Sequence, residues 1–378
     1  MFLNSLLSAN AFDTFQPIAK WLTVGFLAAF VLLSVVEYCT RKAEFGKFAK
    51  NAFFVLAVYL LALAVVFFAL DIVKHYSDEY AEENWLNKTA LVKFVLIPML
   101  VLIAVALLAL VGYALISKYA PAHKKSFALG ALICAVAALM AVLICLSLYY
   151  RDNIANDGYY NSETAAVEQL ALYLGASLSV LVIVGLTFFD KRKFVFDAHS
   201  LAYAGILAAM SFALSYIKLW DMPQGGSVTL VSLLPLMLYA YIFGTKKGVF
   251  VGFTYGLLQA VQDPWLIHPA QFLLDYPVAF AAVGLAGLCS DSKALEKLPQ
   301  IGFSLGAVLA GCMRFACHVL SGVFAFEAYA EGQNVWAYSL VYNAYVFIDV
   351  ALVVLAGALL YTSRSFVKTS KKLNLTNR

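Results

Sequence analysis

Charged side chains are scarce in this chain of 378 residues. Asp, Glu, Lys and Arg make up only 13% of it, whereas a soluble domain carries roughly 25%. Hydrophobic residues account for 63%. This composition excludes a soluble protein and indicates an integral protein of the lipid bilayer. The net charge of +4 does not indicate a nucleic-acid partner, because such binding needs basic residues clustered on one soluble face.

Several motifs of catalysis and metal binding are missing. The six cysteines form no C-x-x-C pair, so neither a disulfide framework nor a zinc site is expected. No G-x-x-x-x-G-K-[ST] phosphate loop occurs, so the chain is not expected to hydrolyse ATP itself. No H-E-x-x-H motif or serine–histidine arrangement indicates an active site. We therefore expect no enzyme, no cofactor and no bound metal.

Long apolar runs are abundant instead. A transmembrane helix needs about 20 mostly apolar residues, and eleven runs approach or exceed that length. They are residues 18–39, 51–73, 91–117, 126–149, 167–189, 200–219, 227–243, 246–262, 270–290, 301–325 and 338–362. The sequence thus predicts an all-α integral membrane fold with about eleven transmembrane helices, five in the N-terminal half and six in a C-terminal bundle.

Charge in the connections predicts the orientation. The odd-numbered connections are basic, as at Arg41, Arg192 and Lys246, and the others are acidic or neutral. Because basic loops favour the cytoplasm, we expect a multi-pass protein of the cell membrane with its N-terminus outside and its C-terminus inside. No basic residue precedes Lys20, so the first span is expected to stay in the membrane rather than be cleaved as a signal.

The polar connection 190–199 divides the chain. We expect a five-span N-terminal membrane region of unknown role over 1–190, a six-span substrate-binding domain over 200–362, and a basic cytoplasmic tail over 363–378. The first region carries little charge inside its spans apart from Glu37 and Asp71 at helix ends, and it offers no obvious ligand site. Matching broken helices in two halves, typical of inverted-repeat transporters, are absent.

Polar side chains gather in the last three spans. They are Asp275, Tyr276, Arg314, His318, Tyr338, Ser339, Asn343 and Asp349. An ionisable group in hydrocarbon costs at least about 2.5–3.5 kcal/mol, so it is usually paired or lines a polar cavity. Such groups on three successive spans predict one shared cavity, and a cavity at membrane depth favours a ligand path.

Asp275 is the leading candidate for contact with a ligand. Gln271 lies one turn earlier on the same helix face, and Pro277 removes a backbone donor beside the acid. A carboxylate in loosened backbone suits a cationic or amine-bearing ligand. The alternative is an acid that meets water or pairs with Arg314.

Arg314 and His318 share a helix face at i, i+4. We favour a ligand role for His318, which can stack, hydrogen-bond or titrate, whereas Arg314 is equally well explained by an ion pair that tethers helices. The other histidines lie in loops or at span ends, so a metal site is not expected. Asp349 is expected to face another helix.

The last span carries an aromatic stripe of Tyr338, Tyr342 and Tyr345. Alone, such a stripe is more typical of packing or of an interfacial belt. With Asn343 on the same side, it predicts a wall for a flat heteroaromatic ligand.

Residues 200–362 contain four distinctive blocks in order, namely AGILAAMSFALS, LLPLMLYAYIFGTKKGVFVGFTYGLLQAV, QFLLDYPVAFAAVGLAGL, and RFACHVLSGVFAF followed by WAYSLVYNA. By these blocks the region resembles a known family, the thiamine-specific (ThiT-like) S components of energy-coupling factor (ECF) vitamin transporters. The resemblance implies a six-helix subunit that captures its substrate outside. Import then depends on a scaffold membrane subunit and two ATPase subunits.

The resemblance also implies roles for individual residues. The pocket would comprise Trp265, Asp275, Tyr276, His318, Phe326, Tyr338 and Asn343, with Asp275 standing where the family typically has Glu. Asp275 and the aromatic faces would hold a thiazolium-type cation, and His318 and Asn343 would bind the pyrimidine edge. Gly205 and Ala209, a small-x-x-x-small pair that alone is equally typical of internal packing, would contact the scaffold subunit.

Two positions depart from the family pattern. The family's outer loop supplies a Trp and a Glu to the ligand, and by spacing these positions are Gly226 and Leu230. Trp220 and Asp221 in the same loop are candidates to replace them. The resemblance therefore implies that the ligand is thiamine, a related pyrimidine or another amine-bearing vitamin. The alternative function is a proton-coupled secondary carrier that uses the intramembrane ionisable groups as a relay.

Overall fold

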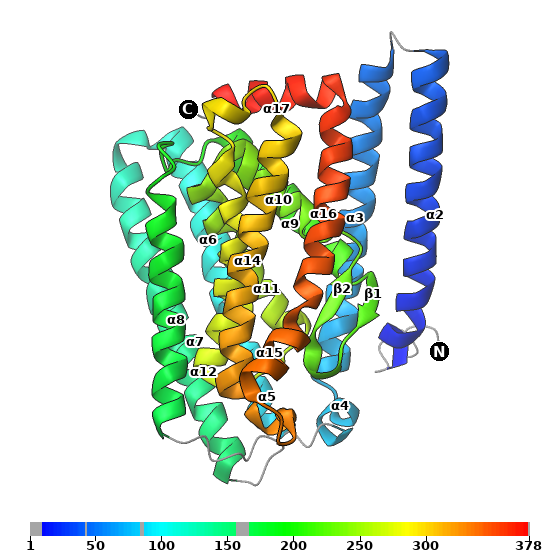
Figure 1. Ribbon diagram of the computed structural model, residues 1–378. Coiled ribbons are helices and arrows are strands. Elements are labelled where there is room, and N and C mark those ends of the chain that lie inside the picture. The colour runs from blue at the N-terminus through cyan, green and yellow to red at the C-terminus, as the bar shows by residue number, and fades with distance from the viewer. Residues whose placement is uncertain (1–9, 42–43, 84–86, 156–165, 377–378) are drawn as a thin grey trace, which may run out of the picture.

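The computed structural model describes residues 10–41, 44–83, 87–155 and 166–376. Within these ranges the chain forms a helical bundle with a single two-stranded hairpin (Figure 1). The predicted all-α architecture is thus confirmed. Residues 1–9 at the N-terminus and residues 377–378 at the end of the predicted tail lie outside the described residues.

Nine helical segments in the described part of the chain are long and apolar enough to cross a membrane. They are Ala11–Thr40, Phe45–His75, Lys88–Tyr119, Pro121–Asp152, Leu170–Thr187, Ala198–Ser215, Pro269–Cys289, Pro299–Ala325 and Val335–Thr362. The predicted count of eleven spans is therefore not confirmed. The two predicted spans missing from this set, 227–243 and 246–262, correspond to helices α10 (Leu234–Phe243) and α11 (Thr245–Gln262).

The predicted span 227–243 is wrong in its first part. Residues Ser227–Thr229 form strand β2, and helix α10 covers only Leu234–Phe243, ten residues. At 1.5 Å per residue such a helix is about 15 Å long, roughly half the hydrocarbon thickness. Nine of its ten residues are buried. A helix that is buried on all sides is apolar all round, and by composition it looks like a membrane span.

The N-terminal region flanks the bundle on two sides (Figure 1). Its elements are α2 (Asn10–Thr40), α3 (Phe45–His75), α4 (Asp78–Glu83), α5 (Lys88–Leu91), the π-helical η1 (Val92–Leu96), α6 (Ile97–Tyr119), η2 (Pro121–His123), α7 (Lys124–Ala155) and α8 (Ala166–Thr187). Helix α3 packs against α9, and α8 packs against α14. Residues of both predicted regions share the same hydrophobic clusters. The division near residues 190–199 stays a prediction.

The C-terminal region builds the centre of the molecule. Its elements are α9 (Ala198–Ser215), β1 (Lys218–Asp221), η3 (Pro223–Gly225), β2 (Ser227–Thr229), α10, α11 (Thr245–Gln262), α12 (Pro269–Leu273), the π-helical η4 (Leu274–Val278), α13 (Ala279–Val283), η5 (Gly284–Cys289), η6 (Lys293–Leu295), α14 (Pro299–Ala325), η7 (Glu327–Ala330), α15 (Val335–Asn343), α16 (Tyr345–Thr362) and α17 (Arg364–Thr376). Strands β1 and β2 pair antiparallel.

Two of the predicted spans are irregular helices. The span around Asp275 passes from α-helix through one π-helical turn that contains Pro277, because proline lacks the amide hydrogen that regular helix bonding needs. The last span is interrupted at Ala344, between α15 and α16. Both irregular points carry predicted ligand residues.

Three glycines hold the helix of Asp275 in place. Gly248, Gly252 and Gly256 recur every four residues along α11, a small-residue pattern that permits close helix contact. A Cβ at Gly252 would lie 2.1 Å from the Phe280 carbonyl oxygen, and one at Gly256 would lie 2.5 Å from the Tyr276 carbonyl oxygen. The backbones of the two segments therefore touch, which fixes the depth and rotation of the segment that carries the acid.

The polar connection before α9 is folded into the bundle rather than exposed. Arg192 Nε donates to Asp190 Oδ1 at 2.9 Å, and Asp190 Oδ2 accepts from the Thr245 amide at 2.7 Å. Burial would raise the pKa of Asp190, but the hydrogen bonds from Arg192 and Thr245 lower it below its usual value. The connection thereby ties the start of the C-terminal region to the α10–α11 turn.

The predicted tail forms the amphipathic helix α17, which lies across one end of the bundle (Figure 1). Phe366 packs against the Tyr361 ring at 5.0 Å, and the Ser370 hydroxyl lies 3.3 Å from the Tyr361 hydroxyl. Lys368 and Lys371 remain exposed. The hairpin and α15 lie toward the opposite end of the molecule (Figure 1).

Candidate functional site

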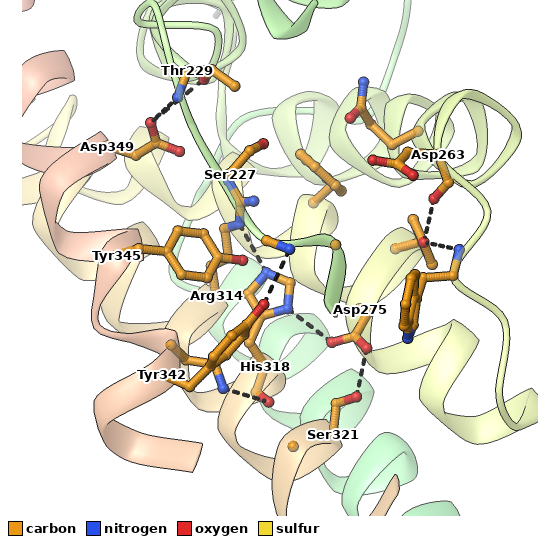
Figure 2. Close-up of a pocket in the computed structure, with 18 of the residues that line it drawn as sticks. Ser227, Thr229, Asp263, Asp275, Arg314, His318, Ser321, Tyr342, Tyr345 and Asp349 are labelled. Carbon is orange, nitrogen blue, oxygen red and sulfur yellow. Dashed lines mark hydrogen bonds and ion pairs between the residues drawn. The ribbon is translucent and has the colours of Figure 1, made fainter. Parts of the chain in front are cut away.

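A cavity of about 130 Å³ lies between the hairpin, the end of α11, the π-helical turn, α14 and the α15–α16 break. All seven residues predicted to bind the ligand line it, namely Trp265, Asp275, Tyr276, His318, Phe326, Tyr338 and Asn343. Figure 2 shows that the polar side chains converge on it from separate elements. The structure thus brings the predicted residues together, and their contact with a ligand stays a prediction.

Asp275 is the polar centre of the cavity. Its carboxylate accepts hydrogen bonds from Gln271 Nε2 at 2.8 Å and from Ser321 Oγ at 2.6 Å, and His318 Nδ1 lies 2.9 Å away (Figure 2). The prediction that Gln271 and Asp275 share one helix face is confirmed. Three donors hold the carboxylate in one orientation, as a binding site for a cation requires.

His318 bridges Asp275 and Arg314. Arg314 Nε donates to His318 Nε2 at 3.1 Å, so Nε2 is an acceptor and the ring proton is placed on Nδ1, toward the carboxylate. The alternative of a direct Asp275–Arg314 pair is therefore wrong. Arg314 also lies over the Phe280 ring, with 4.6 Å from Cζ to the ring centroid. Both ring nitrogens of His318 are engaged within the protein.

Aromatic side chains form the walls of the cavity. The Tyr276 hydroxyl donates to the Asp263 carbonyl at 2.6 Å and accepts from the Trp265 amide at 2.8 Å. These bonds fix the turn that carries Trp265. On the opposite side, the Tyr338 and Tyr342 rings are stacked with centroids 6.0 Å apart. Flat faces on two sides suit an aromatic ligand.

Asn343 lies at the end of α15, where the last span breaks. Its Nδ2 donates to the Ser339 carbonyl at 2.9 Å and to the His318 carbonyl at 3.3 Å. The amide nitrogen is thus committed to backbone groups, and a ligand would meet the amide oxygen as an acceptor. A Cβ at Gly322 would lie 2.2 Å from Ser339 Oγ, so α14 and α15 approach closely at this point.

The tip of the hairpin lines the cavity with small residues, Gly225, Gly226 and Ser227. A Cβ at Gly226 would lie 2.9 Å from Tyr345 Cε1 and 3.1 Å from the Tyr342 hydroxyl. The Tyr342 hydroxyl donates to the Pro223 carbonyl and accepts from the Gly226 amide at 3.3 Å. The two tyrosines therefore occupy the space that a tryptophan at position 226 would need.

The proposed replacements for the family's loop residues do not reach the cavity. Trp220 is 57% exposed and the Asp221 side chain is 63% exposed. Neither lines the cavity, and Leu230 packs against the hydrophobic core. The hypothesis that Trp220 and Asp221 replace the missing Trp and Glu at the cavity is wrong, because both side chains are largely exposed to solvent.

Asp349 has a different partner from the one expected. Its Oδ1 accepts from the Thr229 amide at 2.9 Å (Figure 2), so it holds strand β2 of the hairpin rather than a neighbouring helix. It is 3% exposed and also lines the cavity. The hydrogen bonds of Asp349 thus go to a strand, which the sequence did not predict, because periodicity cannot show that a strand folds back over the helix.

Sequence reasoning missed a polar wall on α9 and α11. Gln259 Nε2 donates to Ser215 Oγ at 3.1 Å, to the Tyr255 hydroxyl at 3.0 Å and to Gln262 Oε1 at 2.6 Å. All four residues line the cavity. Two glutamines at i, i+3 in the apolar run 246–262 were the signal that could have found this wall.

Lys218 and Asp263 form an ion pair at the rim. Lys218 Nζ lies 3.4 Å from Asp263 Oδ2 and 3.0 Å from Asp221 Oδ1. Burial would lower the pKa of Lys218, but the carboxylates of Asp263 and Asp221 raise it above its usual value. The lysine is therefore charged at neutral pH and joins β1 to the end of α11. Among the residues that the structure describes, no three His, Cys, Asp or Glu side chains form a metal site.

Gly205 and Ala209 lie elsewhere, in an apolar groove of about 420 Å³ between α3, α6, α9 and α11. A Cβ added at Gly205 would meet no atom within 4 Å. The surface of α9 is therefore open at this point, although α3 and α6 stand on either side of it.

Comparison with known proteins identifies the family. A family model described as Thiamine transporter protein (Thia_YuaJ) matches residues 201–368. The chain is 40% identical over 132 residues to the thiamine transporter ThiT of Bacillus subtilis, covering 33% of this chain and 68% of that protein. It is 33% identical over 172 residues to the ThiT of Lacticaseibacillus paracasei, covering 41% of this chain and 83% of that protein. The chain belongs to the thiamine transporter protein family.

Family membership confirms the resemblance seen in the sequence. It makes this chain a multi-pass membrane transport protein and not an enzyme. A solved structure described as native-SAD phasing for ThiT from Listeria monocytogenes covers 47% of this chain and 97% of that chain, with 24% identity and a TM-score of 0.40. The family match begins at residue 201, so helices α2 to α8 lie outside it.

Proposed function

We propose that this protein is the substrate-binding S component of an ECF-type uptake system and that it binds thiamine. The observation that best supports this proposal is the carboxylate of Asp275, which hydrogen bonds from Gln271 and Ser321 hold in a cavity with aromatic walls. A partly buried carboxylate attracts a thiazolium cation, and aromatic faces add cation–π attraction. A related pyrimidine compound is the alternative ligand, because the loop positions 226 and 230 carry no Trp or Glu.

The geometry refines the proposed roles. Asp275 would face the cation, with Trp265 and Tyr276 on one side and Phe326 and Tyr338 on the other. Asn343 would accept a hydrogen bond from the amino group of the pyrimidine. Because both ring nitrogens of His318 are engaged, we assign it to holding Asp275 and to stacking, rather than to the pyrimidine edge.

We further propose that translocation depends on a scaffold membrane subunit and two ATPase subunits. The open surface of α9 at Gly205 and Ala209 supports a helix contact with the scaffold, because small residues let helices approach closely in lipid. The charge pattern supports an N-terminus outside and a C-terminus in the cytoplasm, with the cavity toward the outer face. In this arrangement residues 200–362 bind the substrate, and residues 363–378 form the cytoplasmic end.

Titration of the purified protein with thiamine tests the proposal. Tryptophan fluorescence is the readout, since Trp265 lines the cavity. We expect saturable quenching with a submicromolar Kd, and we expect Trp265→Phe to lose most of the signal. A response only to another vitamin would change the substrate and keep the subunit assignment. No response to any vitamin, together with uptake by this chain alone in liposomes under a pH gradient, would establish the proton-coupled carrier instead.

Gly205→Leu is expected to leave thiamine binding unchanged and to abolish ATP-driven uptake by the assembled transporter. The Cβ of the leucine would meet no atom of this chain within 4 Å, and the rest of the side chain would project from α9 into the apolar groove. Vesicle uptake of labelled thiamine in the presence of the partner subunits is the measurement. Gly185→Leu is the matched control, because a Cβ at Gly185 in α8 also meets no atom within 4 Å. Equal loss of uptake in both variants would contradict the proposed contact.

A further inference from the structure

Residues of helices α2 and α3 pack against Tyr216, in the segment that connects α9 to the hairpin. Tyr216 lies two residues before strand β1 of this hairpin and is 1% exposed. Its ring stacks on Phe67 of α3, with centroids 4.4 Å apart and planes at 9°, and Phe12 of α2 lies 5.9 Å away. Gln16 Nε2 donates to the Tyr216 carbonyl at 3.4 Å. The start of the hairpin is thus enclosed by residues outside the family match.

Helix α3 also reaches the rim of the cavity through a buried histidine. His75 Nδ1 lies 3.1 Å from Asp71 Oδ1, and His75 Nε2 lies 3.8 Å from Asp263 Oδ1 (Asp263 is labelled in Figure 2). Asp71 is 1% exposed and His75 is 8% exposed. The other carboxylate oxygen of Asp263 pairs with Lys218 of the hairpin. Asp263 therefore connects α3, the end of α11 and β1.

The contacts at Tyr216 and at Asp263 both hold segments that line the cavity, namely the hairpin and the turn that carries Trp265. The Asp263 carbonyl accepts from the Tyr276 hydroxyl and from the Trp265 amide at 3.0 Å. A Cβ at Gly225, in the hairpin tip, would lie 3.6 Å from Trp265, so the hairpin rests against this tryptophan. A two-stranded hairpin alone is marginally stable in water, and its position over the cavity depends on what holds its base.

We propose that α2 and α3 form an N-terminal clamp, defined by Phe12, Gln16, Phe67, Asp71 and His75, which holds the hairpin and the Asp263–Trp265 turn in the ligand-binding arrangement and so sets the affinity for the substrate. The proposal rests on the proposed function. Pre-organising a binding site lowers the ordering entropy that the ligand must overcome. A loosened clamp therefore speeds ligand release and leaves the residues that touch the ligand intact. This gives the N-terminal region a role that the six-helix family match does not include.

His75→Ala in the full-length protein tests the clamp. We expect the Kd for thiamine to rise about fivefold, mainly through a faster dissociation rate, because most affinity differences between related complexes arise in dissociation. Stopped-flow tryptophan fluorescence measures both rates. Asn51→Ala is the matched control, since Asn51 is a polar residue of the same helix that lies outside the clamp and is exposed. We expect Asn51→Ala to match wild type in both rates.

A double-variant cycle with Asp263→Asn separates coupling from general destabilisation. The effect of His75→Ala should largely disappear in the Asp263→Asn background, because the interaction is already lost. Should His75→Ala fail to fold, Gln16→Ala is the second variant, and it is also expected to speed dissociation. Wild-type rates in the variants that fold would overturn the clamp while thiamine binding stands. Failure of wild type to bind thiamine would instead overturn the proposed function.

Discussion

Asp275→Asn is expected to bind thiamine at least about tenfold more weakly than wild type while remaining folded, since truncating one partner of a buried charge pair costs about 2–5 kcal/mol or more. The substitution removes the negative charge that would face the cation. It also places an NH₂ group where the carboxylate accepts hydrogen bonds from Gln271, His318 and Ser321. Isothermal titration calorimetry and a melting curve give the affinity and the stability of the same sample.

Asp78→Asn is the control for this prediction. Its side chain is 79% exposed and pairs with Lys88, so the same loss of charge occurs far from the cavity, and we expect wild-type affinity. Full affinity in Asp275→Asn would show that this carboxylate does not hold the ligand. The cation would then have to lie near another acid, and the assignment of the aromatic walls would fail with it.

Gly252→Val is expected to prevent stable folding of the protein. Overpacking a core costs about 1–3 kcal/mol, occasionally more, and a Cβ at Gly252 would lie 2.1 Å from a backbone oxygen that cannot turn away. The helices would have to separate, which would also move Phe280 away from Arg314. The yield of monodisperse protein in detergent and its melting temperature are the measurements.

Gly185→Val is the control for Gly252→Val, since its surroundings are open. Both substitutions place a β-branched residue in a helix, so propensity affects them alike. A folded Gly252→Val with a wild-type melting temperature would contradict the close contact of α11 with the Asp275 segment.

The sequence predicted the site better than the fold around it. The pair Gln271–Asp275 and the pair Arg314–His318 are four residues apart, so their helix faces could be derived from spacing alone. Which nitrogen of His318 meets which partner depends on how α14 packs against the π-helical turn, and no spacing within one helix contains that information. Asp349 shows the same limit, because its partner Thr229 is 120 residues away.

The N-terminal region shows a similar limit. Asp71 and His75 lie at the end of α3, as their places in the sequence predict. Their i, i+4 spacing was visible and predicted a shared face, but not that this face meets Asp263. The span 227–243 failed because a short buried helix and a membrane span have the same apolar composition.

The π-helical turn at Leu274–Val278 makes the site sensitive to chain length. A π turn contains more residues than an α turn. Each residue in an α-helix rotates the direction of the side chain about the helix axis by about 100°. An in-frame deletion of one residue in this turn would rotate the helical segments on its two sides by about 100° relative to each other. Asp275 could then face His318, or Phe280 could face Gly252, but not both. Such a deletion could therefore disable the protein even if every side chain of the cavity were retained.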